Sequence, residues 1–284
     1  MNFLNTAACT VLSVFVSSVA LAEDESAILE KLYVDSGLEI LIDYLPASVS
    51  QAIEAEKTTI APEDRVPEEF WQLLLEKVAD DFSPEQMKRV IFEDLRDGMT
   101  DEEINKNIDW VNTPLGKKTK RISETVYSVE GAANLEKCIS ELGVNPPSDL
   151  RSQQVKSLDE SLQATEVGLE LIKTMQVAIA TAGNLSLPTQ LHLPIEEIAE
   201  PFDLFIDTLR EQLRSYTESS YVCIFESLSN DEMGSYLAEL ETPHATSFYQ
   251  AMVKGLKQAV FNSSFQFGES VVEISELLED HQEI

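Results

Sequence analysis

Apolar side chains recur at helical spacing along this chain. Ile104, Ile108 and Val111 would lie on one face of a helix, and a longer stripe repeats every four residues from Phe248 to Val260. Such spacing predicts amphipathic helices, because 3.6 residues complete a helical turn. Alternating strand patterns bounded by Asn-Gly or Asp-Gly turns do not occur in the sequence. The pattern therefore predicts an all-α fold.

Capping residues predict where the central helices begin and end. Ser83-Pro84 with a glutamine two residues later is typical of a helix start, and this helix should reach Asp97. Gly98 would then take a left-handed conformation as the C-terminal cap. A capping box formed by Thr100 and Glu103 opens a short helix at 101–112.

The pair Thr113-Pro114 repeats the helix-start pattern and predicts a longer helix that continues to residue 142. A proline-rich break follows at 145–149. Two features of the first half recur in the second half: Ser229 with Glu232 forms another capping box, and Thr242-Pro243 lies 129 residues after Thr113-Pro114. We therefore expect two tandem helical repeats at 23–144 and 150–284, each with a capped helix-turn-helix. Coincidence between common capping signals is the alternative.

The first 22 residues carry no charged side chain and end in Ala20-Leu21-Ala22 before an acidic run. The apolar stretch is short for a membrane span, which needs about 20 residues, so residues 1–22 predict a cleaved signal peptide. A retained anchor helix is the alternative. We expect export to the periplasm, with no stable membrane anchor after cleavage.

Composition narrows the classes of partner. The 284 residues include 51 Asp and Glu against 20 Lys and Arg, a net charge of −31. This charge repels nucleic acids and anionic bilayers, which excludes them as expected partners. The 262 residues after the signal peptide contain two cysteines, Cys138 and Cys223. An oxidising compartment makes a disulfide between them possible, and two buried free thiols are the alternative.

Residues 99–117 resemble the helix-turn-helix of a bacterial helical family known as domain of unknown function 2059. The first copy keeps the family pattern, which consists of Thr100, Glu103, Trp110, Thr113, Pro114 and Gly116. The second copy keeps Ser229, Glu232, Thr242 and Pro243, but has Glu239 at the aromatic position and His244-Ala245 in place of Leu-Gly. The resemblance implies an exported protein of Gram-negative bacteria, and it implies no reaction, cofactor or catalytic residue. The motif residues are expected to have a structural role.

Known catalytic and metal-binding motifs do not occur. The three histidines lie far apart in the sequence, with no pair spaced to bind metal on one helix face, so we expect no metal or other cofactor. His192, in a loop between two prolines, is the histidine most suited to a functional role. The basic cluster Lys117–Arg121 is expected to pair with acids of the other repeat, with an acidic partner as the alternative.

The apolar stripe that includes Phe261 and Phe265 is expected to lie in the core. The alternative is an apolar groove between the repeats, lined by Phe261, Phe265 and Phe267, which would suit a lipid or a peptide helix. We therefore expect a non-catalytic binding module for a periplasmic protein or an apolar ligand. The alternative is an envelope enzyme, in particular a carboxylate-dependent hydrolase.

Overall fold

The computed structural model describes residues 27–59 and 67–282. The predicted signal peptide therefore lies outside the described residues. Almost all described residues are helical and none forms a strand, which confirms the all-α prediction. A helical segment at 27–36 is followed by α2 (Leu38–Thr59), α3 (Glu68–Asp81), α4 (Pro84–Gly98), α5 (Asp101–Val111), α6 (Pro114–Val126), α7 (Val129–Glu141), α8 (Asp149–Leu162), α9 (Ala164–Ser186), the 3₁₀ turn η2 (Thr189–Leu191), α10 (Ile195–Ile224), α11 (Asn230–Leu240) and α12 (Pro243–Gln282).

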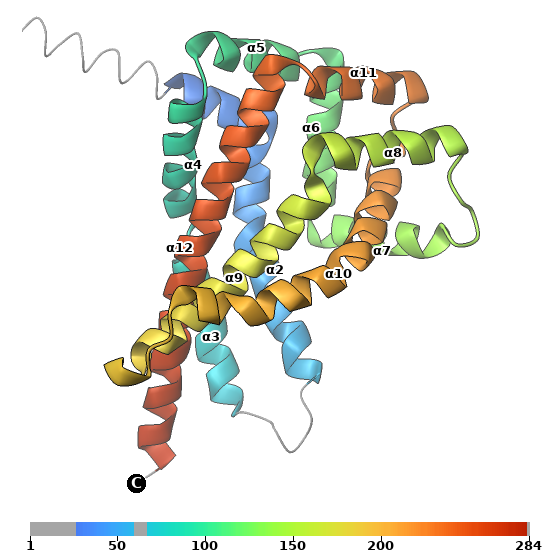
Figure 1. The fold of residues 1–284 in the computed structure, drawn as a ribbon. Helices are drawn as coiled ribbons and strands as arrows, with labels where there is room; N and C mark the ends of the chain where they lie inside the picture. Colours follow the sequence, from blue (N-terminus) through green and yellow to red (C-terminus); the bar gives the residue numbers. More distant parts are fainter. Residues whose placement is uncertain (1–26, 60–66, 283–284) are drawn as a thin grey trace, which may run out of the picture.

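The helix α12 is the axis around which much of the fold is built (Figure 1). Its 40 residues correspond to about 60 Å at 1.5 Å per residue. It packs most extensively against α9 and α4, and also contacts α3 and α5. Two glycines permit the closest contacts: a Cβ at Gly255 would lie 2.8 Å from the Ile91 Cα of α4, and a Cβ at Gly268 would lie 2.7 Å from the Ala182 Cβ of α9.

The largest core cluster explains why α4 is helical. Met87, Ile91 and Leu95 recur every four residues and are almost completely buried. They pack against the first helical segment, α2, α5 and α12. Burial of each such side chain contributes about 1.5 to 3 kcal/mol, so this stripe holds the helix in place. Smaller clusters join α3 to the second half of α12, and α8 to α10 and α11.

The capping predictions are largely confirmed. Thr100 accepts a hydrogen bond from the Glu103 backbone N–H while the Glu103 side chain accepts from the Thr100 N–H, and Ser229 and Glu232 make the same reciprocal pair. Ser83 is the N-cap of α4 and proline follows it, but the Ser83 side chain makes no capping hydrogen bond. Helix starts were therefore readable from the sequence even where one capping bond is missing.

Two predictions of helix ends are wrong. The helix expected to run from Thr113 to residue 142 is divided into α6 and α7, because Tyr127 leaves the helical conformation and Ser128 caps α7 by accepting from the Gly131 N–H. Gly98 is not a left-handed cap: it is the last residue of α4, and Gly37 is the glycine with positive φ among the described residues. A Cβ at Gly98 would lie 2.8 Å from the Ala251 Cβ, so this glycine serves helix packing.

Candidate functional site

The two predicted motifs form two helix-turn-helix units, α5–α6 and α11–α12. Thr113 caps α6 by accepting from the Gly116 N–H, and Thr242 accepts from the Ala245 N–H at the start of α12. A proline is the first residue of both second helices, where its missing N–H costs nothing. Gly116 is buried, and a Cβ there would lie 2.4 Å from the Trp110 carbonyl oxygen. These residues therefore build a tight turn, as a structural role requires.

Each motif contacts the other through its capping-box glutamate. The Lys118 Nζ of α6 bonds both carboxylate oxygens of Glu232, at 2.8 Å. The Ser247 hydroxyl of α12 donates to Glu103, at 2.7 Å. The bond from Lys118, followed by the Ser229 N–H, lowers the pKa of Glu232. The Thr100 N–H, followed by Ser247, lowers the pKa of Glu103.

The basic cluster Lys117–Arg121 thus sends one side chain to an acid of the other predicted repeat. Lys118 makes this ion pair, as expected for the cluster. Lys120 instead donates to the Val34 carbonyl oxygen, and the Arg121 Nε donates to the Lys117 carbonyl oxygen. The intramolecular role predicted for the cluster is therefore seen at Lys118.

Side chains that differ between the motifs still meet at their interface. Trp110 stacks on Tyr236 of α11, with ring centroids 5.8 Å apart. At the position equivalent to Trp110, Glu239 bonds the His244 Nε2 at 2.8 Å, and the Thr242 hydroxyl lies 3.4 Å from that same nitrogen. In a catalytic triad, one ring nitrogen of the histidine bonds the carboxylate and the other ring nitrogen bonds the nucleophile. The Thr242, His244 and Glu239 arrangement therefore lacks the geometry of a catalytic triad.

A disulfide joins Cys138 of α7 to Cys223 of α10, with Cα atoms 6.0 Å apart. The bond favours the bridged alternative over two free thiols. It links the last helix before the Pro-Pro break to a helix of the second half, and closes a loop across 85 residues of sequence. The two predicted repeats are therefore covalently tied in the structure.

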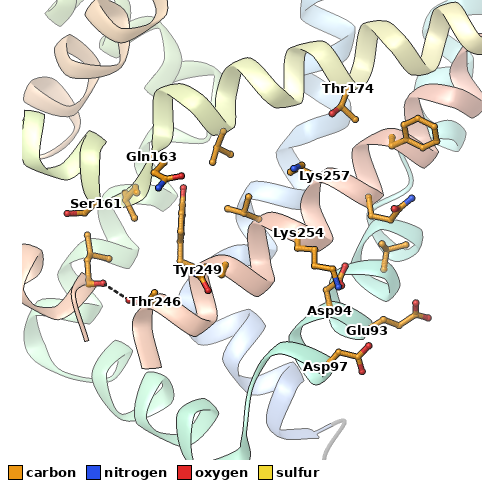
Figure 2. A pocket seen from close by; sticks show the side chains of 18 residues that line it. Glu93, Asp94, Asp97, Ser161, Gln163, Thr174, Thr246, Tyr249, Lys254 and Lys257 are labelled. Carbon is orange, nitrogen blue, oxygen red and sulfur yellow. Dashed lines mark hydrogen bonds and ion pairs between the residues drawn. The ribbon is translucent and has the colours of Figure 1, made fainter. Parts of the chain in front are cut away.

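A groove of about 780 Å³ runs along one face of α12, between α4 on one side and α8 and α9 on the other (Figure 2). Its apolar lining includes Val253 and Phe261 of α12, Val90 of α4 and Val167 of α9. The wall formed by α4 precedes the Pro-Pro break and the other walls follow it. The groove therefore lies between a helix that precedes the Pro-Pro break and helices that follow it.

Acidic side chains gather where α4 borders this groove. Glu93, Asp94 and Asp97 line that side (Figure 2). Asp94 is largely buried and pairs with the Lys254 Nζ at 2.5 Å, a contact that raises the pKa of Lys254. Glu93 and Asp97 are exposed, and neither has an ion-pair partner within the part of the chain that the structure describes. The α4 rim of the groove is therefore negatively charged.

A second hollow, of about 570 Å³, adjoins the groove on the other side of α9. Phe261 and Thr174 line both spaces. Lys257 of α12 pairs with Glu170 of α9 beside them. The two hollows together give α12 and α9 a long, partly apolar surface that is open to solvent.

The three phenylalanines named for a possible groove have different surroundings. Phe261 lines the groove, and its ring stacks on Phe265 at 6.3 Å. Phe267 is buried against Phe82 in the core cluster formed with α3. Sequence reasoning missed the groove residues Tyr249 and Val253. Their spacing of four from each other would have indicated a second apolar face on α12.

His192 lies in the connection between α9 and α10. Its Nε2 lies 2.8 Å from the Leu187 carbonyl oxygen, within the same loop. His192 is not among the residues that line the groove. Its observed partner is thus local backbone.

Residues 27–59 and 67–282 contain no candidate metal site and no candidate membrane-spanning helix. No cluster of three or more His, Cys, Asp or Glu side chains is placed to hold a metal ion. No helix there has the length and apolar character to span a bilayer. The chain matches no protein-family model, no curated protein and no solved structure.

Proposed function

We propose that this chain is an exported, non-catalytic binding module of the bacterial periplasm, and that the groove along α12 accepts a basic amphipathic segment of a protein partner. The resemblance of residues 99–117 to an exported family and the uncharged segment at 1–22 support the location. The groove itself supports the function, because it combines an apolar floor with an acidic rim.

The unpartnered charges of Glu93 and Asp97 are the observation that carries the proposal. They stand beside the apolar side chains of Val253 and Phe261 in one open groove. A helix that presents apolar residues at intervals of three and four, flanked by lysines or arginines, matches both features. The net charge of −31 also attracts a cationic partner over long distances.

Two ion pairs favour binding over the alternative of a carboxylate-dependent hydrolase. Asp94 is bonded to Lys254, and Glu170 is bonded to Lys257. A hydrolase of that kind needs two carboxyl groups that face one reacting atom, one of them protonated. Both carboxylates are already bonded to ammonium groups of α12, so the described structure offers them as parts of the binding-site walls rather than as a pair that faces one reacting atom.

A designed peptide tests this proposal. The probe is a fluorescein-labelled helical peptide of leucine and lysine, with leucines at i, i+3, i+4 and i+7, and the control peptide has the same composition in scrambled order. Fluorescence anisotropy would measure the affinity of each for the protein. In the groove variant Glu93→Gln with Asp97→Asn, we expect about tenfold weaker binding of the amphipathic peptide, since each rim charge contributes up to about 1 kcal/mol.

The matched control removes two exposed acids elsewhere. Glu130→Gln with Glu141→Gln changes the net charge equally but lies on α7, away from the groove. We expect this variant to bind within about twofold of the original protein, because long-range attraction alone is screened. Equal weakening by both double variants, or equal affinity for the scrambled peptide, would show that only total charge matters and would overturn the groove proposal.

A further inference from the structure

The connection between α9 and α10 is chemically unlike the rest of this acidic chain. From Thr174 to Ile195 no residue is Asp, Glu, Lys or Arg, although a quarter of all residues are charged. The stretch comprises the end of α9, the short turn η2 and the first residue of α10. It forms the turn of a helical hairpin, which lies at the lower left of the view in Figure 1, where α9 gives way to α10. We call residues 184–195 the tip.

The tip exposes an unusual concentration of apolar side chains. Five of them have between 45% and 57% of their surface accessible: Leu185, Leu187, Leu191, Leu193 and Ile195. They come from a helix end, a turn and a helix start, rather than from one face of a single helix. Only a few large apolar side chains elsewhere in the described chain are this exposed. Exposed apolar side chains gathered on one short segment are typical of a surface that leaves water when it functions.

The tip also satisfies much of its own backbone. The Asn184 side chain accepts from the Leu193 N–H and donates to the Leu193 carbonyl oxygen. The Leu191 N–H donates to the Pro188 carbonyl oxygen, and His192 is bonded to the Leu187 carbonyl oxygen. Two prolines, at 188 and 194, have no N–H to satisfy. Backbone groups exposed to water can bond water instead of one another. In an apolar medium, each backbone group without a hydrogen-bond partner costs several kcal/mol.

We propose that the tip inserts shallowly into the interface of an electrically neutral lipid bilayer. Its uncharged surface complements zwitterionic lipid, while the net charge of −31 opposes approach to anionic lipid. Glu196 and Glu197 follow the tip directly and are exposed, which limits the depth of insertion to the tip itself. A protein groove binds apolar residues that lie on one face of a helix. The leucines of the tip are instead distributed around a turn, an arrangement that suits a fluid bilayer.

Vesicle flotation tests the proposal with protein that begins at Glu23, a form that retains every described residue. We expect this protein to float with phosphatidylcholine vesicles, and to float less when phosphatidylglycerol is mixed in. In the variant Leu187→Ser with Leu191→Ser, the affinity for phosphatidylcholine should fall about thirtyfold, because two half-exposed leucines no longer enter the bilayer. Both side chains are exposed, so the fold should survive, and circular dichroism would verify it.

The control variant Val144→Ser with Leu150→Ser removes two apolar side chains that are 82% and 50% exposed at another place on the surface. It should float like the original protein. Phosphatidylcholine vesicles should shift the fluorescence of the variant Leu191→Trp to shorter wavelength, measured as the difference from the original protein with its native Trp71 and Trp110, and should not shift that of Val144→Trp. Equal loss of flotation in both double variants would overturn the proposal. So would a dimer, seen by sedimentation equilibrium, that the tip variant dissociates, since the tip would then bind a second copy of the chain.

Discussion

Replacing Gly255 by alanine tests how closely α12 lies against α4. A Cβ at this position would lie 2.8 Å from the Ile91 Cα and 3.3 Å from the Asp94 Cβ. Distances under 3 Å between such atoms are not tolerated, and the nearest atom belongs to the backbone of α4. The added methyl group therefore fits only if α12 and α4 move apart, and this movement loosens the core around Ile91.

The expected magnitude is the difference between two effects. Alanine in a helix interior is favoured over glycine by about 1 kcal/mol. Overpacking against a rigid neighbour costs about 1 to 3 kcal/mol, and a backbone contact belongs at the upper end of that range. We therefore expect Gly255→Ala to lower the free energy of unfolding by about 2 kcal/mol. For a chain of this size, that corresponds to roughly 4 to 8 °C in Tm.

Gly234 of α11 supplies the control. A Cβ there would have its nearest neighbour, the Gln154 Nε2, at 4.0 Å, so Gly234→Ala should stabilise the protein by about 1 kcal/mol through helix propensity alone. Urea unfolding followed by circular dichroism, with the disulfide intact, would compare the two variants. If Gly255→Ala is as stable as Gly234→Ala, α12 and α4 are not in the close contact described above, and the reasoning is refuted.

Three further predictions concern stability. Alkylation under denaturing, non-reducing conditions should find Cys138 and Cys223 unreactive, and the double serine variant should lose about 4 kcal/mol for a loop spanning 85 residues; two labelled thiols would contradict the bridge. Burial raises the pKa of Tyr236 and Tyr249 to about 12. The stability that their neutral phenols provide is complete below a pH of about 10 and is lost as the pH rises to about 12. Alkaline unfolding should therefore accompany the rise in tyrosinate absorbance. Titration of both phenols at their ordinary pKa in folded protein would contradict this prediction. Self-repulsion among the acids should make Tm rise with NaCl between about 10 and 200 mM, and a flat or falling Tm would show that the acids are already compensated.

Local signals predicted the helix starts of this fold well. Thr100, Thr113 and Ser229 each cap the helix that the sequence assigned to them. A capping side chain acts within three residues of its own position, so one short window of sequence contains the whole interaction. The all-α class followed for the same reason, since helical spacing is also a local property.

Features that depend on distant residues were not predictable. Gly98 resembles a helix cap in sequence, but its role is set by Ala251, which is more than 150 residues away. The break between α6 and α7 was missed for another reason: Ser128 caps α7 locally, but no proline marks the end of α6 at Tyr127. The disulfide stayed an open alternative, because sequence gives the spacing of Cys138 and Cys223 but not the distance between their Cα atoms.

The groove and the tip also combine features that the sequence predicted with features that only the structure shows. Phe261 lines the groove that the sequence offered as an alternative to core packing, but the acidic rim comes from α4, for which the sequence predicted only a start and an end. An amphipathic pattern identifies residues that leave water without identifying the helix that covers them. In the tip, the sequence indicated His192, whereas the described structure shows exposed leucines around it.

The contacts between the motifs bear on the origin of the fold. Glu232 lies 129 residues after Glu103, and Ser247 lies 129 residues after Lys118. In the structure, Glu103 bonds Ser247 and Glu232 bonds Lys118, so the capping glutamate of each unit reaches the fifth residue of the other unit's second helix. Coincident capping signals would give each unit its own bonds but would not exchange contacts between them. Two copies related by approximate two-fold symmetry exchange them necessarily, because a contact from i to j implies its partner from j to i. The exchange is the pattern of contacts expected if the two halves are copies of one helical unit, which stays a prediction of the sequence.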